Sequence, residues 1–154
     1  DKSIQNFLWI GFIKIFFPNS KIILTERNSR DISLSIFKIN FKNGFMNFAY
    51  SQNEIAEFYN NYIDLINFWK NLFEGEIYTV SYEKLIRNPD DQIKDIINFC
   101  ELTWDENCLN HHKNKSTIHT ASIDQARKPI YLTSENKSNY YSNHLNKMYS
   151  LLKN

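Results

Sequence analysis

The sequence of 154 residues contains few of the residues that crosslink or bend small folds: two cysteines, three glycines and three prolines. Cys100 and Cys108 are too few for the disulfide framework of a small secreted scaffold. The core must therefore rest on apolar side chains, which make up 42% of the chain. At this length that fraction suffices for one folded domain and excludes a disordered segment.

Net charge is also small, at +1. This value excludes a general surface for nucleic acids or other polyanions, so any anion site must be local. Arginine is scarce within the basic set, with four arginines against fourteen lysines. An arginine in this chain is therefore a residue of interest.

Long hydrophobic runs are missing as well. The longest, FLWIGFIKIFF, is interrupted by Lys14 and is shorter than the roughly 18 residues that a membrane span needs. No signal peptide is recognisable, so we expect a cytoplasmic protein without a membrane span. The chain begins at Asp1 and not at Met, so we also expect a fragment that lacks an N-terminal part.

Apolar periodicity predicts helices that alternate with two short strands. We expect NGFMNFAY to form a loop and 103–138 to be polar and irregular. The predicted helices and strands are a buried helix over 4–16, a strand at KIILT (21–25), a helix from Asn28 or Ser29 to about Phe41, an amphipathic helix over 53–73, a strand at EIYTVSY (76–82), a helix beginning in RNPDDQIKDIINFCEL and a closing helix over 141–152.

This alternation indicates an α/β fold with a parallel sheet flanked by helices. Two strands are too few for a stable sheet, so further strands are expected upstream of Asp1.

The segment TERNSRDISLSIF, which follows the first predicted strand, holds two of the four arginines. Arg27 stands at the carboxyl end of that strand, which is the edge where open α/β sheets bind ligands. Ser35 lies about two turns into the next helix, whose N-terminal amides favour an anion. A guanidinium fork and a hydroxyl suit a phosphate, so we predict a local anion site there.

The neighbouring Arg30 and Asp31 are expected to be helix-start and surface residues, and Ser33 to have no special role. Judged on spacing alone, Arg27 and Ser35 are equally well explained as surface residues.

Five segments in order resemble the sulfotransferase family, in particular bacterial sulfotransferases often fused to tetratricopeptide repeats and, more distantly, tyrosylprotein sulfotransferases. They are DKSIQNF, FPNSKIILTERNSRDISLSIF, VSYEKLIRNPDDQIKDIINFCELTWDENCL, TASIDQARKPIY and NKSNYYSNHL. The resemblance implies a P-loop-like three-layer fold, of which residues 1–154 would be a partial domain, roughly its C-terminal two-thirds.

The resemblance also implies the donor 3′-phosphoadenosine 5′-phosphosulfate (PAPS), the product adenosine 3′,5′-bisphosphate (PAP) and no metal. Arg27 and Ser35 would bind the 3′-phosphate, and Tyr82 would lie near the adenine and phosphate. In relatives a segment closes over the nucleotide, and Arg127 and Lys128 match it. Lys137 matches a basic residue that reaches the phosphates, although Asn-Lys-Ser replaces the usual Gly-Arg-Trp.

For the transfer step, the resemblance gives Lys2 the role of stabilising the leaving bridge oxygen and Ser122 a contact with the sulfonate. The Gly-rich phosphosulfate loop and the general base of relatives match nothing here and would lie upstream of Asp1. We therefore expect this chain to be inactive, or nearly so, on its own.

Three other interpretations stay open at this stage. Cys108, His111, His112 and His119 suggest zinc, but their spacing fits no common site. The aromatic stripe over 53–73 suits a non-catalytic nucleotide-binding or helical partner-binding module, although such a stripe is more often core. A P-loop kinase would need an upstream phosphate loop and leaves TASIDQARKPIY without a role.

The acceptor is expected to be a hydroxyl group on a peptide, a sugar or a small molecule, with 42–53 contributing to its recognition. No nucleic-acid partner is expected, and the resemblance suggests an upstream tetratricopeptide-repeat region.

Overall fold

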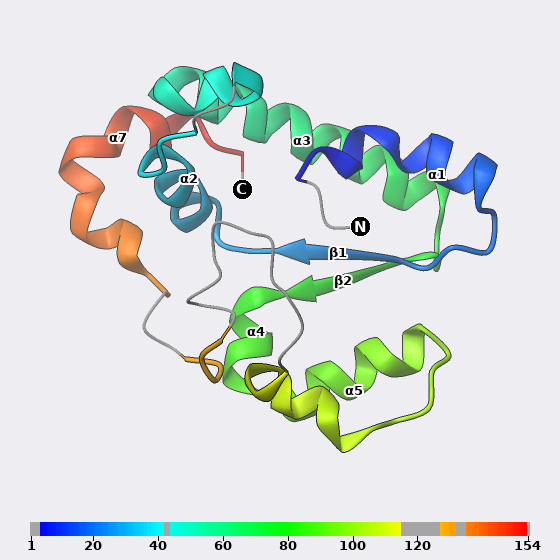
Figure 1. The fold of residues 1–154 in the computed structure, drawn as a ribbon. Coiled ribbons are helices and arrows are strands. Elements are labelled where there is room, and N and C mark those ends of the chain that lie inside the picture. The colour runs from blue at the N-terminus through cyan, green and yellow to red at the C-terminus, as the bar shows by residue number, and fades with distance from the viewer. Residues whose placement is uncertain (1–3, 42–43, 115–126, 132–134, 154) are drawn as a thin grey trace. The chain divides into compact units, whose positions relative to one another are not determined.

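A computed structural model describes residues 4–41, 44–114, 127–131 and 135–153 (Figure 1). The chain divides into two compact units. The first comprises Asp1–Ile22, Arg27–Ile77 and Asn136–Asn154, and the second comprises Ile23–Glu26 and Tyr78–Glu135.

The described residues form helices around a small parallel sheet of two strands, as predicted. In chain order the elements are η1 (Ile4–Trp9), α1 (Ile10–Phe16), β1 (Ile22–Glu26), α2 (Ser29–Phe37), η2 (Gly44–Tyr50), α3 (Gln52–Leu72), β2 (Ile77–Ser81), α4 (Tyr82–Arg87), α5 (Pro89–Phe99), η3 (Glu106–Lys113), η4 (Lys137–Tyr141) and α7 (Ser142–Leu151), where η marks a 3₁₀ helix. Strands β1 and β2 are hydrogen-bonded neighbours and point the same way in Figure 1.

Helix α3 is the longest element of the first unit and contributes Ile55, Ala56 and Ile66 to its core. The Ser51 hydroxyl caps it by accepting the amide of Glu54 at 3.4 Å. Ile55 and Ile66 are each 1% exposed, as the apolar spacing over 53–73 predicted. The aromatic residues of this stripe, Phe58, Tyr59, Tyr62 and Trp69, are half-buried, and Phe7 packs edge-to-face on Phe58 and Tyr62.

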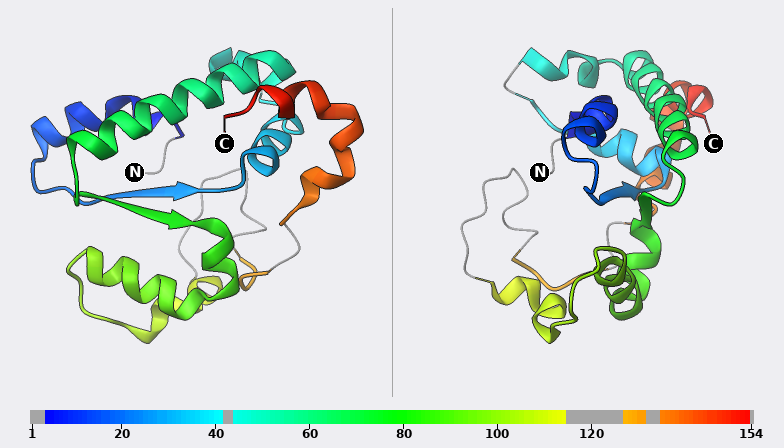
Figure 2. Two further views of the ribbon diagram at one scale, coloured as in Figure 1. Left: turned by 180° about the vertical axis from the view of Figure 1, so that it is seen from behind. Right: turned by 90° about the vertical axis from the view of Figure 1, so that its right-hand side faces the viewer.

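Helices α2 and α7 pack on α3 at one end, as the left view of Figure 2 shows. The cluster buried between them consists of Leu34, Ile55, Ala56, Leu145, Met148, Tyr149 and Leu152. Ridges of apolar side chains from three helices thus exclude water from one contiguous core.

At the other end of α3, η1 and α1 lie against it. The Trp69 indole donates a hydrogen bond to the carbonyl of Phe7 at 2.9 Å, and a side chain at Gly11 would lie 2.8 Å from the same indole. Residues 4–16 are helical, as predicted, but many of their side chains are not buried. Phe7 and Ile10 are buried, whereas Ile15 and Phe16 are each 72% exposed.

Lys14, which interrupts the apolar run, is itself buried. Its ammonium donates to the carbonyls of Pro18 at 2.7 Å and Ser20 at 3.2 Å, and it forms an ion pair with Glu76. These contacts satisfy the charge of a lysine removed from water and fix the turn between α1 and β1.

In the second unit, α4 and α5 follow β2 in close succession. The Ser81 hydroxyl caps α4, and Pro89 begins α5, where its missing N–H costs nothing. Tyr78 stacks on Phe99, and the buried Val80 and Ile86 complete this smaller core.

Several local predictions were wrong. Within NGFMNFAY, Gly44–Tyr50 forms η2 with a kink at Met46 and is not an open loop. Helix α2 ends at Phe37 and not at about Phe41, and η3 forms within the segment that was expected to be irregular. The second strand ends at Ser81 because Tyr82 already begins α4. None of the helices among the described residues is long and apolar enough to cross a membrane.

Candidate anion-binding site at the start of helix α2

Arg27 follows β1 directly and precedes Asn28, the residue that caps α2. The Asn28 side-chain oxygen accepts the amides of Arg30 at 3.1 Å and Asp31 at 3.2 Å. These first-turn amides therefore already have an acceptor within the chain. The sequence analysis had expected them to be directed at a bound anion. The positive end of the helix dipole still lies beside Arg27.

Asp31 is the central residue of this region. It is 3% exposed, and each carboxylate oxygen accepts one backbone amide from the far end of the sequence. Asn136 N–H reaches Oδ2 at 2.7 Å, and Ser138 N–H reaches Oδ1 at 2.8 Å. A buried carboxylate needs such partners, and these distances are typical of charge-assisted hydrogen bonds. The expectation that Asp31 is a surface residue is therefore wrong.

These two hydrogen bonds bring Lys137 to the region, because it lies between Asn136 and Ser138. Lys137 is exposed and begins η4. Arg27 Nη2 lies 3.9 Å from Asp31 Oδ2, the oxygen that also accepts the Asn136 amide; this is an ion-pair distance and too long for a hydrogen bond. Asp31 thus links two of the predicted phosphate-binding cations.

Tyr149, on α7, is a buried residue that contacts the same region. Its hydroxyl donates to the Ser138 carbonyl at 3.5 Å, and the Arg30 guanidinium lies 5.4 Å from the centre of its ring. Burial, followed by the negative charge of Asp31, raises the pKa of the Tyr149 hydroxyl, while Arg30 acts in the opposite direction. We name Arg27, Asp31, Lys137 and Tyr149 the Asp31 cluster.

The two serines of α2 differ sharply in exposure. Ser35, predicted to bind phosphate, is exposed, whereas Ser33, expected to have no special role, is fully buried. An exposed hydroxyl is available as a donor, so the structure keeps Ser35 accessible to a ligand.

The other predicted site residues fall elsewhere. Tyr82, half-buried, begins α4 in the second unit. Arg127 is half-buried and Lys128 is exposed in the same unit, where the Lys128 carbonyl lies 3.1 Å from the His111 ring. Lys2 and Ser122 lie outside the described residues, so their roles stay predictions.

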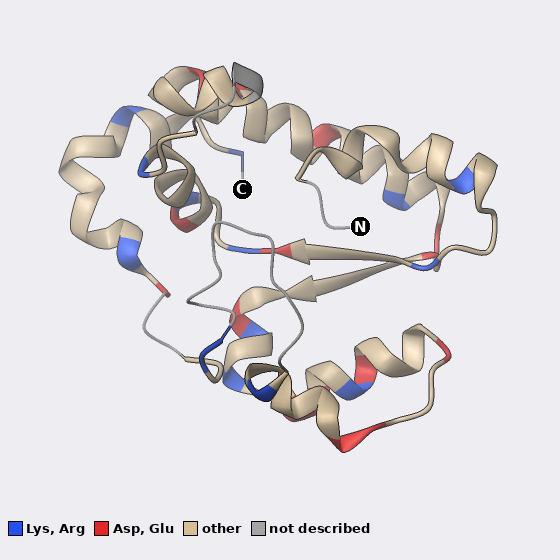
Figure 3. Ribbon diagram, viewed as in Figure 1, with Lys and Arg blue, Asp and Glu red and all other residues tan. Residues whose placement is uncertain are grey.

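Charged residues are interspersed along the described helices (Figure 3), in keeping with the net charge of +1. Within the described ranges, no group of three or more His, Cys, Asp and Glu side chains is placed to hold a metal ion. Cys108, His111 and His112 lie on η3, and His119 is outside those ranges.

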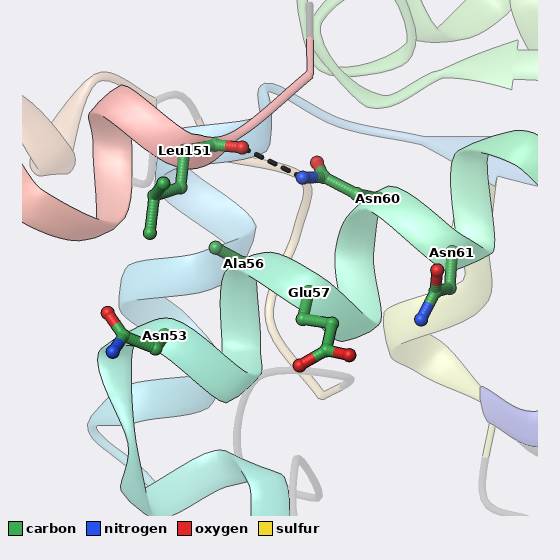
Figure 4. A pocket seen from close by; sticks show the side chains of 6 residues that line it. All are labelled: Asn53, Ala56, Glu57, Asn60, Asn61 and Leu151. Carbon is green, nitrogen blue, oxygen red and sulfur yellow. Dashed lines mark hydrogen bonds between the residues drawn. The ribbon is translucent and has the colours of Figure 1, made fainter.

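A pocket lies along the first half of α3, beside the last residue of α7 (Figure 4). Here the Asn60 side-chain amide donates to the Leu151 carbonyl at 2.8 Å. The lining residues are Asn53, Ala56, Glu57, Asn60, Asn61 and Leu151. With Glu57 as its charged residue, this pocket does not suit an anion.

Sequence reasoning named Arg27 and Lys137 as candidates but not Asp31 and Tyr149. One local signal was present for Asp31, since it stands four residues after Arg27, where the two side chains form an ion pair. For Tyr149 the sequence predicted only a closing helix over 141–152.

Comparison with known proteins gives a consistent set of matches. A model of the sulfotransferase family matches residues 1–106. An uncharacterized protein of Aquifex aeolicus (strain VF5) is 36% identical over 154 residues, which covers 99% of this chain and 20% of that protein. A putative protein-tyrosine sulfotransferase of Caenorhabditis briggsae is 31% identical over 106 residues, covering 69% of this chain and 38% of that protein.

More distantly, sulfotransferase 1B1 of Mus musculus is 26% identical over 140 residues, covering 76% of this chain and 47% of that protein. The chain thus spans less than half the length of each of these relatives.

Proposed function

The chain belongs to the sulfotransferase family, and we propose that its Asp31 cluster binds the 3′-phosphate of the sulfuryl donor PAPS. The observation that carries this proposal is the link that Asp31 makes between Arg27 and the backbone on both sides of Lys137. In this proposal the Arg27 guanidinium and the Lys137 ammonium together neutralise the phosphate dianion.

In this proposal the residues of α2 and η4 divide the contacts to the phosphate. The Arg27 guanidinium offers two parallel N–H donors, the Ser35 hydroxyl a third donor, and the Lys137 ammonium a point charge. The partial positive charge at the start of α2 adds to this attraction. Tyr82 is proposed to lie near the adenine and phosphate, and Arg127 and Lys128 to belong to a segment that closes over the nucleotide.

The reaction proposed for the whole protein is an in-line transfer. The acceptor hydroxyl oxygen forms a bond to sulfur while the bond from sulfur to the bridging oxygen breaks, and the acceptor proton passes to a base. PAP leaves with the bridging oxygen, where the Lys2 ammonium is proposed to stabilise the developing charge, and Ser122 is proposed to contact the sulfonate. Such catalysis depends mainly on positioning and electrostatics.

Calorimetric titration of the chain with PAP tests the donor site. We expect weak, measurable binding, because the residues proposed to contact the 3′-phosphate are all in the chain. Arg27→Ala should weaken binding by roughly ten- to a hundredfold, the cost of one charged bidentate contact.

The matched control is Lys147→Ala, which removes one positive charge from an exposed position on α7 outside the cluster. We expect its affinity to stay within about twofold of the unmodified chain, since screening weakens a distant charge. Equal losses in both variants would mean that general charge, and not the Asp31 cluster, holds the nucleotide. No binding at all would favour a partner-binding module.

A further inference from the structure

The loop that carries Lys137 is held in one conformation from the opposite end of the chain. Asn136 has a backbone φ of 59°, in the left-handed region that asparagine tolerates better than most residues. Its amide and that of Ser138 converge on the two oxygens of Asp31, 105 and 107 residues away in sequence. The backbone N–H groups of the two residues that flank Lys137 are therefore both bound to Asp31.

The Ser138 end of this loop has a second anchor. Ser138 is 3% exposed, and its carbonyl accepts the Tyr149 hydroxyl, so both its N–H and its C=O are bound. Lys137 itself is exposed. An exposed lysine on a backbone fixed at both neighbours has lost the mobility of its main chain and keeps only that of its side chain.

We propose that Asp31 is a positioning residue for the donor site: its carboxylate fixes the backbone of 136–138 and so presents the Lys137 ammonium to the same phosphate that Arg27 binds. This proposal rests on the proposed function. Asp31 also lies 3.9 Å from Arg27 Nη2, so one carboxylate restrains the approach of both cations.

Positioning and simple electrostatics predict opposite signs for one substitution. Asp31→Asn removes a negative charge from beside the phosphate site, and Coulomb's law alone then predicts tighter binding of PAP. The two amides bind different oxygens of Asp31, however, and asparagine places an NH₂ donor at one of those two positions, so one amide loses its acceptor. Positioning therefore predicts weaker binding, by roughly fivefold or more.

A double-mutant cycle locates the effect. If Asp31 acts through Lys137, Asp31→Asn should cost much less affinity in a Lys137→Ala background than in the unmodified chain. Equal costs in the two backgrounds, or tighter binding by Asp31→Asn, would overturn the proposal. Asp64→Asn is the charge-matched control, since Asp64 on α3 pairs with Lys153 and not with the cluster.

Hydrogen exchange supplies a readout that needs no nucleotide. In the unmodified chain the amides of Asn136 and Ser138 should exchange slowly, and in Asp31→Asn at least one should exchange tenfold faster or more. The amide of Glu54, bound to the α3 cap, should be unchanged. Fast exchange of both amides in the unmodified chain would also overturn the proposal, even if Asp31→Asn does not fold.

The outcomes separate this inference from the proposed function. If Arg27→Ala and Lys137→Ala weaken PAP binding while Asp31→Asn does not, the donor site stands and the positioning role fails. If PAP does not bind at all, the proposed function fails, and slow exchange at Asn136 and Ser138 still shows whether Asp31 holds the loop.

Discussion

At the scale of single residues, the buried Asp31 decides how the candidate site is assembled. Sequence reasoning treated it as a surface residue, because a carboxylate in the first turn of a helix is normally explained by the helix dipole. Its actual partners are amides more than a hundred residues away, which no local pattern reveals. Arg27 was predictable, because its position after a strand and its rarity in the chain are both local features.

Tyr149 gives a prediction about pH. Burial and the charge of Asp31 raise its pKa above the ordinary value of 10.0, so the unfolded chain loses this proton first as the pH rises. The contribution to stability is thus complete below about pH 10 and is lost as the pH rises through the folded pKa. We expect the free energy of unfolding to fall less steeply above pH 10 in Tyr149→Phe than in the unmodified chain, measured by urea denaturation.

The control for this prediction is Tyr140→Phe, because the Tyr140 side chain is 85% exposed. It should leave the slope above pH 10 unchanged. Identical slopes for the unmodified chain and Tyr149→Phe would contradict the raised pKa.

At the scale of elements, apolar spacing located helices better than it located burial. The long helix over 53–73 was predicted within one residue at each end, since twenty-one residues of regular spacing leave little ambiguity. The segment 4–16 was equally apolar and was expected to be buried, yet Ile15 and Phe16 are exposed. Composition shows how apolar a helix is, and only the fold shows what covers it.

One substitution at two positions tests this difference. Ile55→Ala should lower the free energy of unfolding by about 2–5 kcal/mol, because Ile55 is 1% exposed between α2, α3 and α7 and its truncation leaves a cavity. Ile15→Ala should change it by less than about 0.5 kcal/mol, because that side chain is 72% exposed. Urea denaturation of both variants measures the two values.

A large loss of stability in Ile15→Ala would show that α1 packs against something that the described residues do not include. A small loss in Ile55→Ala would contradict the assignment of the core to the contact between α2, α3 and α7.

At the scale of the whole molecule, the family and the α/β class were predictable, because five motifs in order constrain far more than any one motif does. The full site was not. Asp31 pairs with Arg27 and binds the backbone on both sides of Lys137, and Ser35 is exposed on α2. The roles of all the proposed site residues stay predictions. The spacing of residues along a sequence does not reveal which distant loops come together, because their meeting depends on buried polar contacts.

Turnover is the prediction that belongs to this scale. Mixed with PAPS and a broad set of hydroxyl acceptors, these 154 residues should give no sulfated product, since they contain no match to the Gly- and Ser/Thr-rich loop that cradles the phosphosulfate group in the family. Mass spectrometry of the acceptors checks this outcome. Clear product formation would show that other residues of the chain supply those donors.

The most direct measurement compares two nucleotides that differ by one phosphate. Calorimetric titration of the unmodified chain should give tighter binding of adenosine 3′,5′-bisphosphate than of adenosine 5′-monophosphate, and Arg27→Ala should remove most of that difference. Equal affinities for the two nucleotides, or a difference that persists in Arg27→Ala, would contradict the claim that the Asp31 cluster binds the donor's 3′-phosphate.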